Sequence, residues 1–152
     1  MEKLTIISRT DLARRTRQIV DRVRRGDTVL VESYGEQQIV LLDILDYRIM
    51  RAVAAYHTSL PARSPLLDPK MEPVGLTEAD LLKSEPQVRW NRVIAAYLDG
   101  QINLVRAASL LELSRFELDE RFHRLDVPRR MGSETLQEAH SEVEAILPAS
   151  EG

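Results

Sequence analysis

The side chains with the clearest chemical potential are seven arginines between Arg9 and Arg25, offset in that run only by Asp11 and Asp21. A guanidinium is charged at every ordinary pH, and its planar fork suits phosphate oxygens and guanine edges. The whole chain shares this bias, because 18 of its 21 basic residues are Arg. The pattern favours contact with nucleic acid, and the alternative is a solvated helix face.

Charge is spread unevenly along the chain, which has a net charge of −3. Residues 1–26 hold eight basic and three acidic side chains, whereas residues 131–152 hold five Glu and neither Lys nor Arg. A basic head and an acidic tail indicate two different partners, or one chain that touches both DNA and a basic protein.

Signals for catalysis are poor. The three histidines, His57, His123 and His140, are far apart and form no H-x-x-x-H pair for a metal. The absence of Cys excludes disulfides, thiolate zinc sites and Cys nucleophiles. No glycine-rich phosphate loop is present. We therefore expect no enzyme, no catalytic residue, no metal and no cofactor.

The composition is that of a globular protein, with 43% hydrophobic and 30% charged residues among 152. No apolar run approaches the roughly 20 residues that cross a bilayer, and residues 1–5 do not resemble a secretory signal. We expect a cytoplasmic protein without a membrane partner.

Residues 1–56 predict a β-α-β-β-α unit. A helix over 11–25, capped by Ser8 or Thr10, would bury one apolar face and project its arginines from the other. A turn over 33–36 would join two strands, with Gly35 at positive φ. The helix over 44–56, capped by Asp43, is apolar over so wide an arc that it needs a second partner besides the small sheet. The strands are expected at 4–7, 28–32 and 38–42, and the apolar face of the first helix is Leu12, Ile19, Val20 and Val23.

Residues 57–87 contain five of the seven prolines and predict an extended linker. Thr77 can cap a short helix within it. Leu66 and Leu67 lie between prolines, where they form a docking peptide or lie back on their own domain.

Residues 88–147 predict an all-helical unit with a helix-turn-helix. Ala107 and Ala108 allow close helix packing, and Ser114 with Glu117 forms a capping box for the second helix, 115–125. That helix balances three arginines with three carboxylates, so it has no net attraction for phosphate. Compact packing is as good an interpretation as DNA reading. Each unit has fewer than 60 residues and is marginal alone, so dimerisation or partner binding is expected.

The first 56 residues resemble the Phd/YefM antitoxin family. The resemblance is carried by Thr5-Ile6-Ile7-Ser8, Asp11-Leu12-Ala13, Ile19 to Val23, Arg25 to Val31, Gly35, Ile39 to Leu42 and Leu45-Asp46-Tyr47. It implies a small α/β homodimer that binds operator DNA, with a C-terminal extension that silences a toxin. The DNA-binding role transfers to Ser8, Arg9, Thr10, Arg14, Arg15 and Arg17. The chain departs from the family before the hairpin glycine, where Glu32-Ser33-Tyr34 replaces basic residues.

The segment from about Val93 to Pro128 is similar to a second, small antitoxin-associated family, often paired with PIN-type ribonucleases. The residues that carry this resemblance are Ala95-Ala96-Tyr97, Gly100-Gln101-Ile102, Ala107-Ala108, Leu113-Ser114-Arg115, Phe116, Leu118 and Val127-Pro128. We therefore expect a type II antitoxin that neutralises a toxin and represses its own operon. The predicted toxin-binding residues are Leu66, Leu67, Leu136, Val143, Ile146 and Leu147. The alternatives are a helix-turn-helix regulator without a toxin, and an assembly module without DNA binding.

Overall fold

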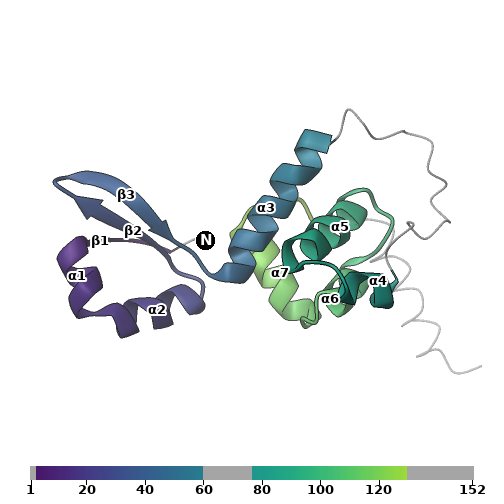
Figure 1. The fold of residues 1–152 in the computed structure, drawn as a ribbon, viewed down its shortest axis with the longest axis horizontal. Coiled ribbons are helices and arrows are strands. Elements are labelled where there is room, and N and C mark those ends of the chain that lie inside the picture. Colours follow the sequence, from purple (N-terminus) through teal and green to yellow (C-terminus); the bar gives the residue numbers. More distant parts are fainter. Residues whose placement is uncertain (1–2, 60–76, 130–152) are drawn as a thin grey trace, which may run out of the picture.

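The computed structural model describes residues 3–59 and 77–129. They form a sheet with two short helices at the N-terminal end and a group of helices beside it along the long axis of the molecule (Figure 1). The expected mixture of strands and helices is confirmed. The elements are β1 (Leu4–Ser8), α1 (Arg9–Arg14), α2 (Thr16–Arg24), β2 (Thr28–Ser33), β3 (Glu36–Leu41), α3 (Ile44–Ser59), α4 (Glu78–Leu82), α5 (Pro86–Leu98), α6 (Leu104–Leu110) and α7 (Arg115–Arg124).

The sheet has the order β1-β2-β3, with β1 parallel and β3 antiparallel to β2. Parallel neighbours cannot be joined by a tight turn, so α1 and α2 form the crossover and cover one face of the sheet (Figure 1). Tyr34 and Gly35 join β2 to β3 with φ values of 54° and 78°. Two successive positive φ values are those of a type I′ turn, whose twist matches the strands it connects.

The single helix expected over 11–25 is wrong in detail, because the chain forms two helices that meet at an angle. Ser8 is the cap, and its Oγ accepts a hydrogen bond from Asp11 N at 3.1 Å. Arg15 interrupts the helix with φ −120° and ψ 27°. A straight helix of that length would span about 22 Å, longer than the roughly 17 Å of a five-residue strand. The break lets both short helices lie on the sheet. It also shifts the helical phase, so Val20 is 46% exposed instead of buried.

Helix α3 packs with the helical unit, although it was expected to complete the N-terminal one. Its buried Ile49 and Ala52 belong to the same core as Val93 and Ile94 of α5. The helices α1 and α2 already cover one face of the sheet, and the wide apolar arc of α3 finds its second partner in α5. Only the short connection at residues 42–43 then joins the sheet to α3.

The helical core is built around Trp90, Leu118 and Phe122. Leu81 of α4 is also buried there, so the stretch expected as a linker contributes a core side chain. The predicted caps at Thr77 and Ser114 are confirmed, because each side chain accepts a hydrogen bond from the backbone N–H three residues on. Asn103 caps α6 in the same way. Ala107 and Ala108 are buried where α6 meets its neighbours, as the predicted helix-turn-helix requires.

Candidate nucleic-acid interface

Four arginines form an exposed group on the helices that cover the sheet. Arg9, Arg14, Arg15 and Arg17 are all exposed. Within the described ranges, none of their side chains takes part in an ion pair or hydrogen bond. Arg14, Arg15 and Arg17 lie at the junction of α1 and α2, where the helix breaks at Arg15. Guanidiniums that no carboxylate neutralises are the groups that can replace counterions on a nucleic-acid backbone.

The other two predicted DNA contacts lie at the start of the same surface. Ser8 is half-buried, and its hydroxyl oxygen is engaged in capping α1, although the hydroxyl can still donate a hydrogen bond. Thr10 is exposed in the first turn. The structure therefore places all six residues on α1 and its flanks, together with Asp11, the one carboxylate in this stretch.

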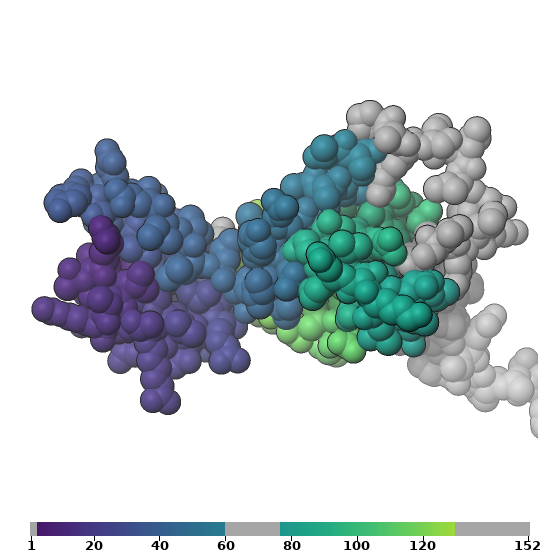
Figure 2. Space-filling model, viewed as in Figure 1, coloured from purple at the N-terminus to yellow at the C-terminus, as the bar shows by residue number. Residues whose placement is uncertain are grey.

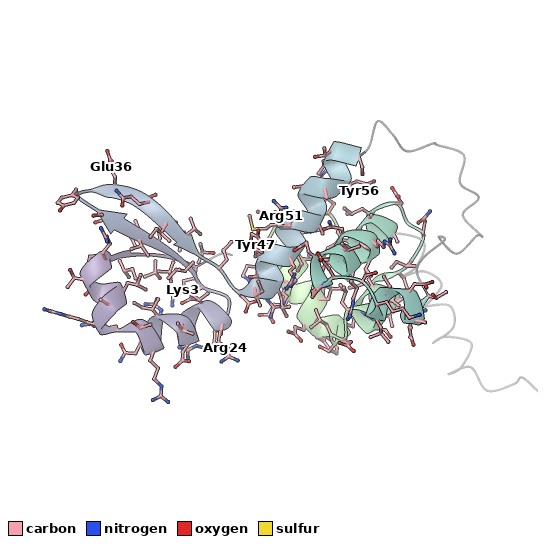
Figure 3. All side chains as sticks on the ribbon, viewed as in Figure 1. Lys3, Arg24, Glu36, Tyr47, Arg51 and Tyr56 are labelled. Atoms are coloured by element: carbon pink, nitrogen blue, oxygen red, sulfur yellow. The ribbon has the colours of Figure 1, made fainter. Side chains whose placement is uncertain are left out.

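Arg22 departs from the expected arginine face. Its Nε donates to Asp27 at 3.1 Å and its Nη2 donates to Thr5 at 2.9 Å. These bonds tie α2 to β1 and to the loop before β2, so Arg22 stabilises the unit. Arg24, labelled in Figure 3, instead projects from the end of α2.

The arginines of the helix-turn-helix turn inward. Arg121 Nη1 lies 2.7 Å from both Asp43 Oδ1 and Asp46 Oδ1. Arg124 donates to both carboxylate oxygens of Asp46, with its Nη2 2.9 Å from Oδ1 and its Nε 3.1 Å from Oδ2. Only 11% and 14% of these two arginine side chains are exposed. Helix α7 therefore anchors to the start of α3 through both of them.

This network raises the pKa of Arg121. Burial by itself lowers the pKa of Arg121, but hydrogen bonds to Asp46 and Asp43 and the charges of both carboxylates outweigh it, and the pKa is raised. Arg121 Nε is buried without a hydrogen-bond partner among the described atoms. Two features of the sequence pointed to the network: a lone acid within an apolar helix, at Asp46, and arginines three residues apart, which share a helix face.

Comparison with protein families, with curated proteins and with solved structures found no match. The case for this surface therefore depends on its geometry and charge. Between residues 3 and 42, eight basic side chains oppose five carboxylates.

The sheet face opposite α1 and α2 is apolar and uncovered. Ile6, Leu30 and Val40 lie side by side across the three strands, and Ile6 and Val40 are 51% and 54% exposed. Figure 2 shows the surface indented between this unit and α3. Tyr47 lies on the side of α3 nearer the sheet (Figure 3) and, like Met50, is exposed. Exposed apolar groups thus continue from the sheet onto the helix.

A small cleft of about 170 Å³ lies between α4, α5 and α6. Its Arg89 donates to Leu81 O and faces Glu112 at 3.6 Å. No group of three metal-binding side chains gathers in residues 3–59 or 77–129. None of the helices in these ranges has the length and apolar character needed to cross a bilayer.

The predicted toxin-binding residues lie outside the described residues. They are Leu66, Leu67, Leu136, Val143, Ile146 and Leu147.

Proposed function

We propose that this protein is the antitoxin of a type II toxin–antitoxin system. Its N-terminal unit binds operator DNA as a homodimer, and the rest of the chain binds and neutralises a protein toxin. The proposed toxin is a ribonuclease of the PIN type. The observation that carries the DNA-binding half is the exposed, unpaired arginine group of α1 and α2.

The exposed arginines support DNA binding through charge. Each phosphate contact releases a counterion, so binding through Arg14, Arg15 and Arg17 makes affinity fall steeply with salt. A two-fold dimer doubles the number of such contacts on one duplex. Salt dependence is accordingly the measurable signature of this surface.

The bare sheet face supports dimerisation. Among the described residues, the sheet unit buries only four apolar side chains, Ile19, Val23, Val29 and Val31. Such a small core leaves the unit marginal, because little apolar surface is removed from water. A second copy that covers Ile6 and Val40 would supply the missing burial.

The arrangement of α7 disfavours the rival function, a regulator that reads DNA through the helix-turn-helix. Two of the three arginines on α7, Arg121 and Arg124, already bind buried carboxylates. Withdrawing them to contact phosphate would strand Asp46 as an unpaired buried charge. Arg115 is the one exposed arginine of α7 on which this rival function could rely.

The test compares three variants of the full chain on a duplex taken from upstream of its own coding sequence, by mobility shift at several salt concentrations. Replacing Arg14, Arg15 and Arg17 together with Ala should weaken binding and lower the slope of log affinity against log salt by about 3 per protomer. A charge-matched control replaces three exposed cations of the helical unit with Ala, namely Arg51, Lys83 and Arg92.

The control should bind nearly as the wild-type chain does, apart from a small loss of general attraction. Equal loss in both triple variants would contradict a localised interface. Loss confined to Arg115→Ala would favour the helix-turn-helix regulator instead. If neither the wild-type chain nor any variant shifts the duplex at low salt, the remaining interpretation is the assembly module without DNA binding.

The toxin-binding half is tested by coexpression with the product of the neighbouring gene. Growth arrest that this chain relieves, together with copurification of the two proteins, is the expected result. Relief without a stable complex would contradict neutralisation by occlusion.

A further inference from the structure

Helix α7 carries an aromatic side chain that the core does not use. Phe116 is 84% exposed, although Leu118 and Phe122 of the same helix are fully buried. Two residues correspond to about 200° of helical rotation, so Phe116 points away from the side that Leu118 packs. The core therefore takes Leu118 and leaves Phe116 in solvent.

The charges around Phe116 are mostly negative. Within four residues on either side, the only basic group is Arg115, whereas four side chains are carboxylates: Glu112, Glu117, Asp119 and Glu120. Glu117 accepts a hydrogen bond from Arg121, and Asp119 faces Arg129 at 3.3 Å. Glu112 faces Arg89 of α5 at 3.6 Å with its side chain 74% exposed, and Glu120 is also exposed.

The inward turn of Arg121 and Arg124 produces this imbalance. In the sequence, the three arginines of α7 cancel its three carboxylates. In the fold, two of those arginines are used by Asp43 and Asp46, which belong to another helix and its cap. The outer surface of α7 therefore keeps more acids than bases, although Arg89 and Arg129 from outside the helix face Glu112 and Asp119.

We infer that Phe116 and the surrounding carboxylates, here called the Phe116 surface, dock a basic protein that offers an apolar pocket ringed by Lys or Arg. A buried aromatic anchor supplies much of the binding energy in such contacts, and the surrounding charges speed association and select the partner. The inference deepens the proposed function and rests on it where the partner is called a toxin, since a nuclease that holds RNA phosphates has a basic active face.

Charge also decides among the other occupants. A second copy would set two acidic surfaces against each other, and like charges in contact are costly. The segment 131–152 of the same chain has five Glu and no Lys or Arg, so it is equally disfavoured. DNA phosphates would meet Glu112 and Glu120. A basic protein is the occupant that these charges favour.

The experiment uses the full chain in the cells that encode it, with photoreactive benzoylphenylalanine in place of Phe116. The same label in place of Tyr34, a fully exposed aromatic of the sheet unit, is the matched control. The protein cross-linked only from position 116 is identified and purified, and its binding to the unlabelled chain is measured. The expected partner has a net positive charge and is not cross-linked from position 34.

Binding of the purified pair then tests the anchor and the charges separately. Phe116→Ala should weaken binding by about 30-fold or more, the loss typical of a central anchor, without lowering thermal stability. Tyr34→Ala should bind as the wild-type chain does. Glu112→Gln with Glu120→Gln should slow association and flatten its salt dependence.

The inference is overturned by any of several results. In the cross-linking experiment, these are the lack of an adduct specific to position 116, or an adduct with a second copy, with residues 131–152 of the same chain, with DNA or with an acidic protein. In the binding experiment, it is full affinity of Phe116→Ala for the partner. A partner that docks as expected but does not arrest growth leaves the Phe116 surface standing and contradicts the antitoxin function. A toxin that this chain neutralises but that binds Phe116→Ala at full affinity contradicts the Phe116 surface and leaves the antitoxin function standing.

Discussion

The buried carboxylate of Asp46 gives the sharpest prediction about stability. Asp46 accepts hydrogen bonds from Arg121 at 2.7 Å and from Arg124 at 2.8 Å, 2.9 Å and 3.1 Å, and only 4% of its side chain is exposed. Asp46→Asn keeps the size of the side chain but removes its charge. It also turns an amide N–H₂ toward guanidinium N–H groups that need an acceptor.

The expected loss of unfolding free energy depends on which acids remain for Arg121 and Arg124 once Asp46 has lost its charge. Removing one side of a buried ion pair costs about 3–5 kcal/mol. Arg121 keeps Asp43 at 2.7 Å and Glu117 at 3.2 Å, whereas no other acid faces Arg124 among the described residues. The loss should therefore lie near the lower end, at about 3 kcal/mol. That is a large share of the 5–15 kcal/mol typical of a whole domain.

The assay is urea unfolding followed by the fluorescence of Trp90. This is the only Trp in the sequence, and it is buried in the helical core, so it reports that unit. In a double-mutant cycle with Arg124→Met, the pair should show a coupling of about 2 kcal/mol, within the range for side chains in one buried network. The double variant should then be more stable than the two separate losses predict.

The matched control is Asp119→Asn, which makes the same chemical change at an exposed ion pair. Asp119 faces Arg129 at 3.3 Å, and both side chains are over a third exposed. Such a pair contributes about 0–1 kcal/mol. If Asp46→Asn loses no more than Asp119→Asn, the buried network does not hold α7 to α3, and the inward assignment of the α7 arginines is wrong.

Three further predictions concern the turn after α2, the bare sheet face and pH. Gly26→Ala should destabilise the chain by at least about 2 kcal/mol in urea unfolding, because φ is 104° and the new Cβ would lie 2.6 Å from a guanidinium nitrogen of Arg124, which Asp46 holds in place. Gly35→Ala, with φ 78° but open space, should cost only about 1 kcal/mol, and equal losses would contradict the contact. Ile6→Ser with Val40→Ser should shift sedimentation from dimer to monomer while the circular dichroism is retained, and an unchanged dimer would place the interface elsewhere. Because the pKa of Arg121 is raised in the folded state, its contribution to stability is complete below the unfolded-state pKa. That contribution is lost only as pH rises through the folded-state pKa, in strongly alkaline solution. A step in stability near neutral pH that disappears in Arg121→Met would refute this prediction.

Local signals in the sequence determined most of the secondary structure. Ser8, Asp43 and Ser114 cap their helices because a short polar side chain satisfies a backbone N–H without help from the rest of the fold. Gly35 sits at the predicted turn because it tolerates positive φ. The sequence also predicted that the arginines of α1 and α2 are exposed, because charged side chains without neighbouring acids have to remain in water.

Only tertiary structure decided which unit α3 joins and which way the α7 arginines point. Hydrophobic periodicity predicts the apolar arc of a helix but not the element that packs against it. Helix α3 packs against α5 because α1 and α2 already cover one face of the sheet. The sequence does not distinguish an arginine that binds phosphate from one that binds a carboxylate 75 residues away, as Arg121 binds Asp46. That choice depends on burial and distance between segments remote in the chain, and it left the outer face of α7 acidic around Phe116.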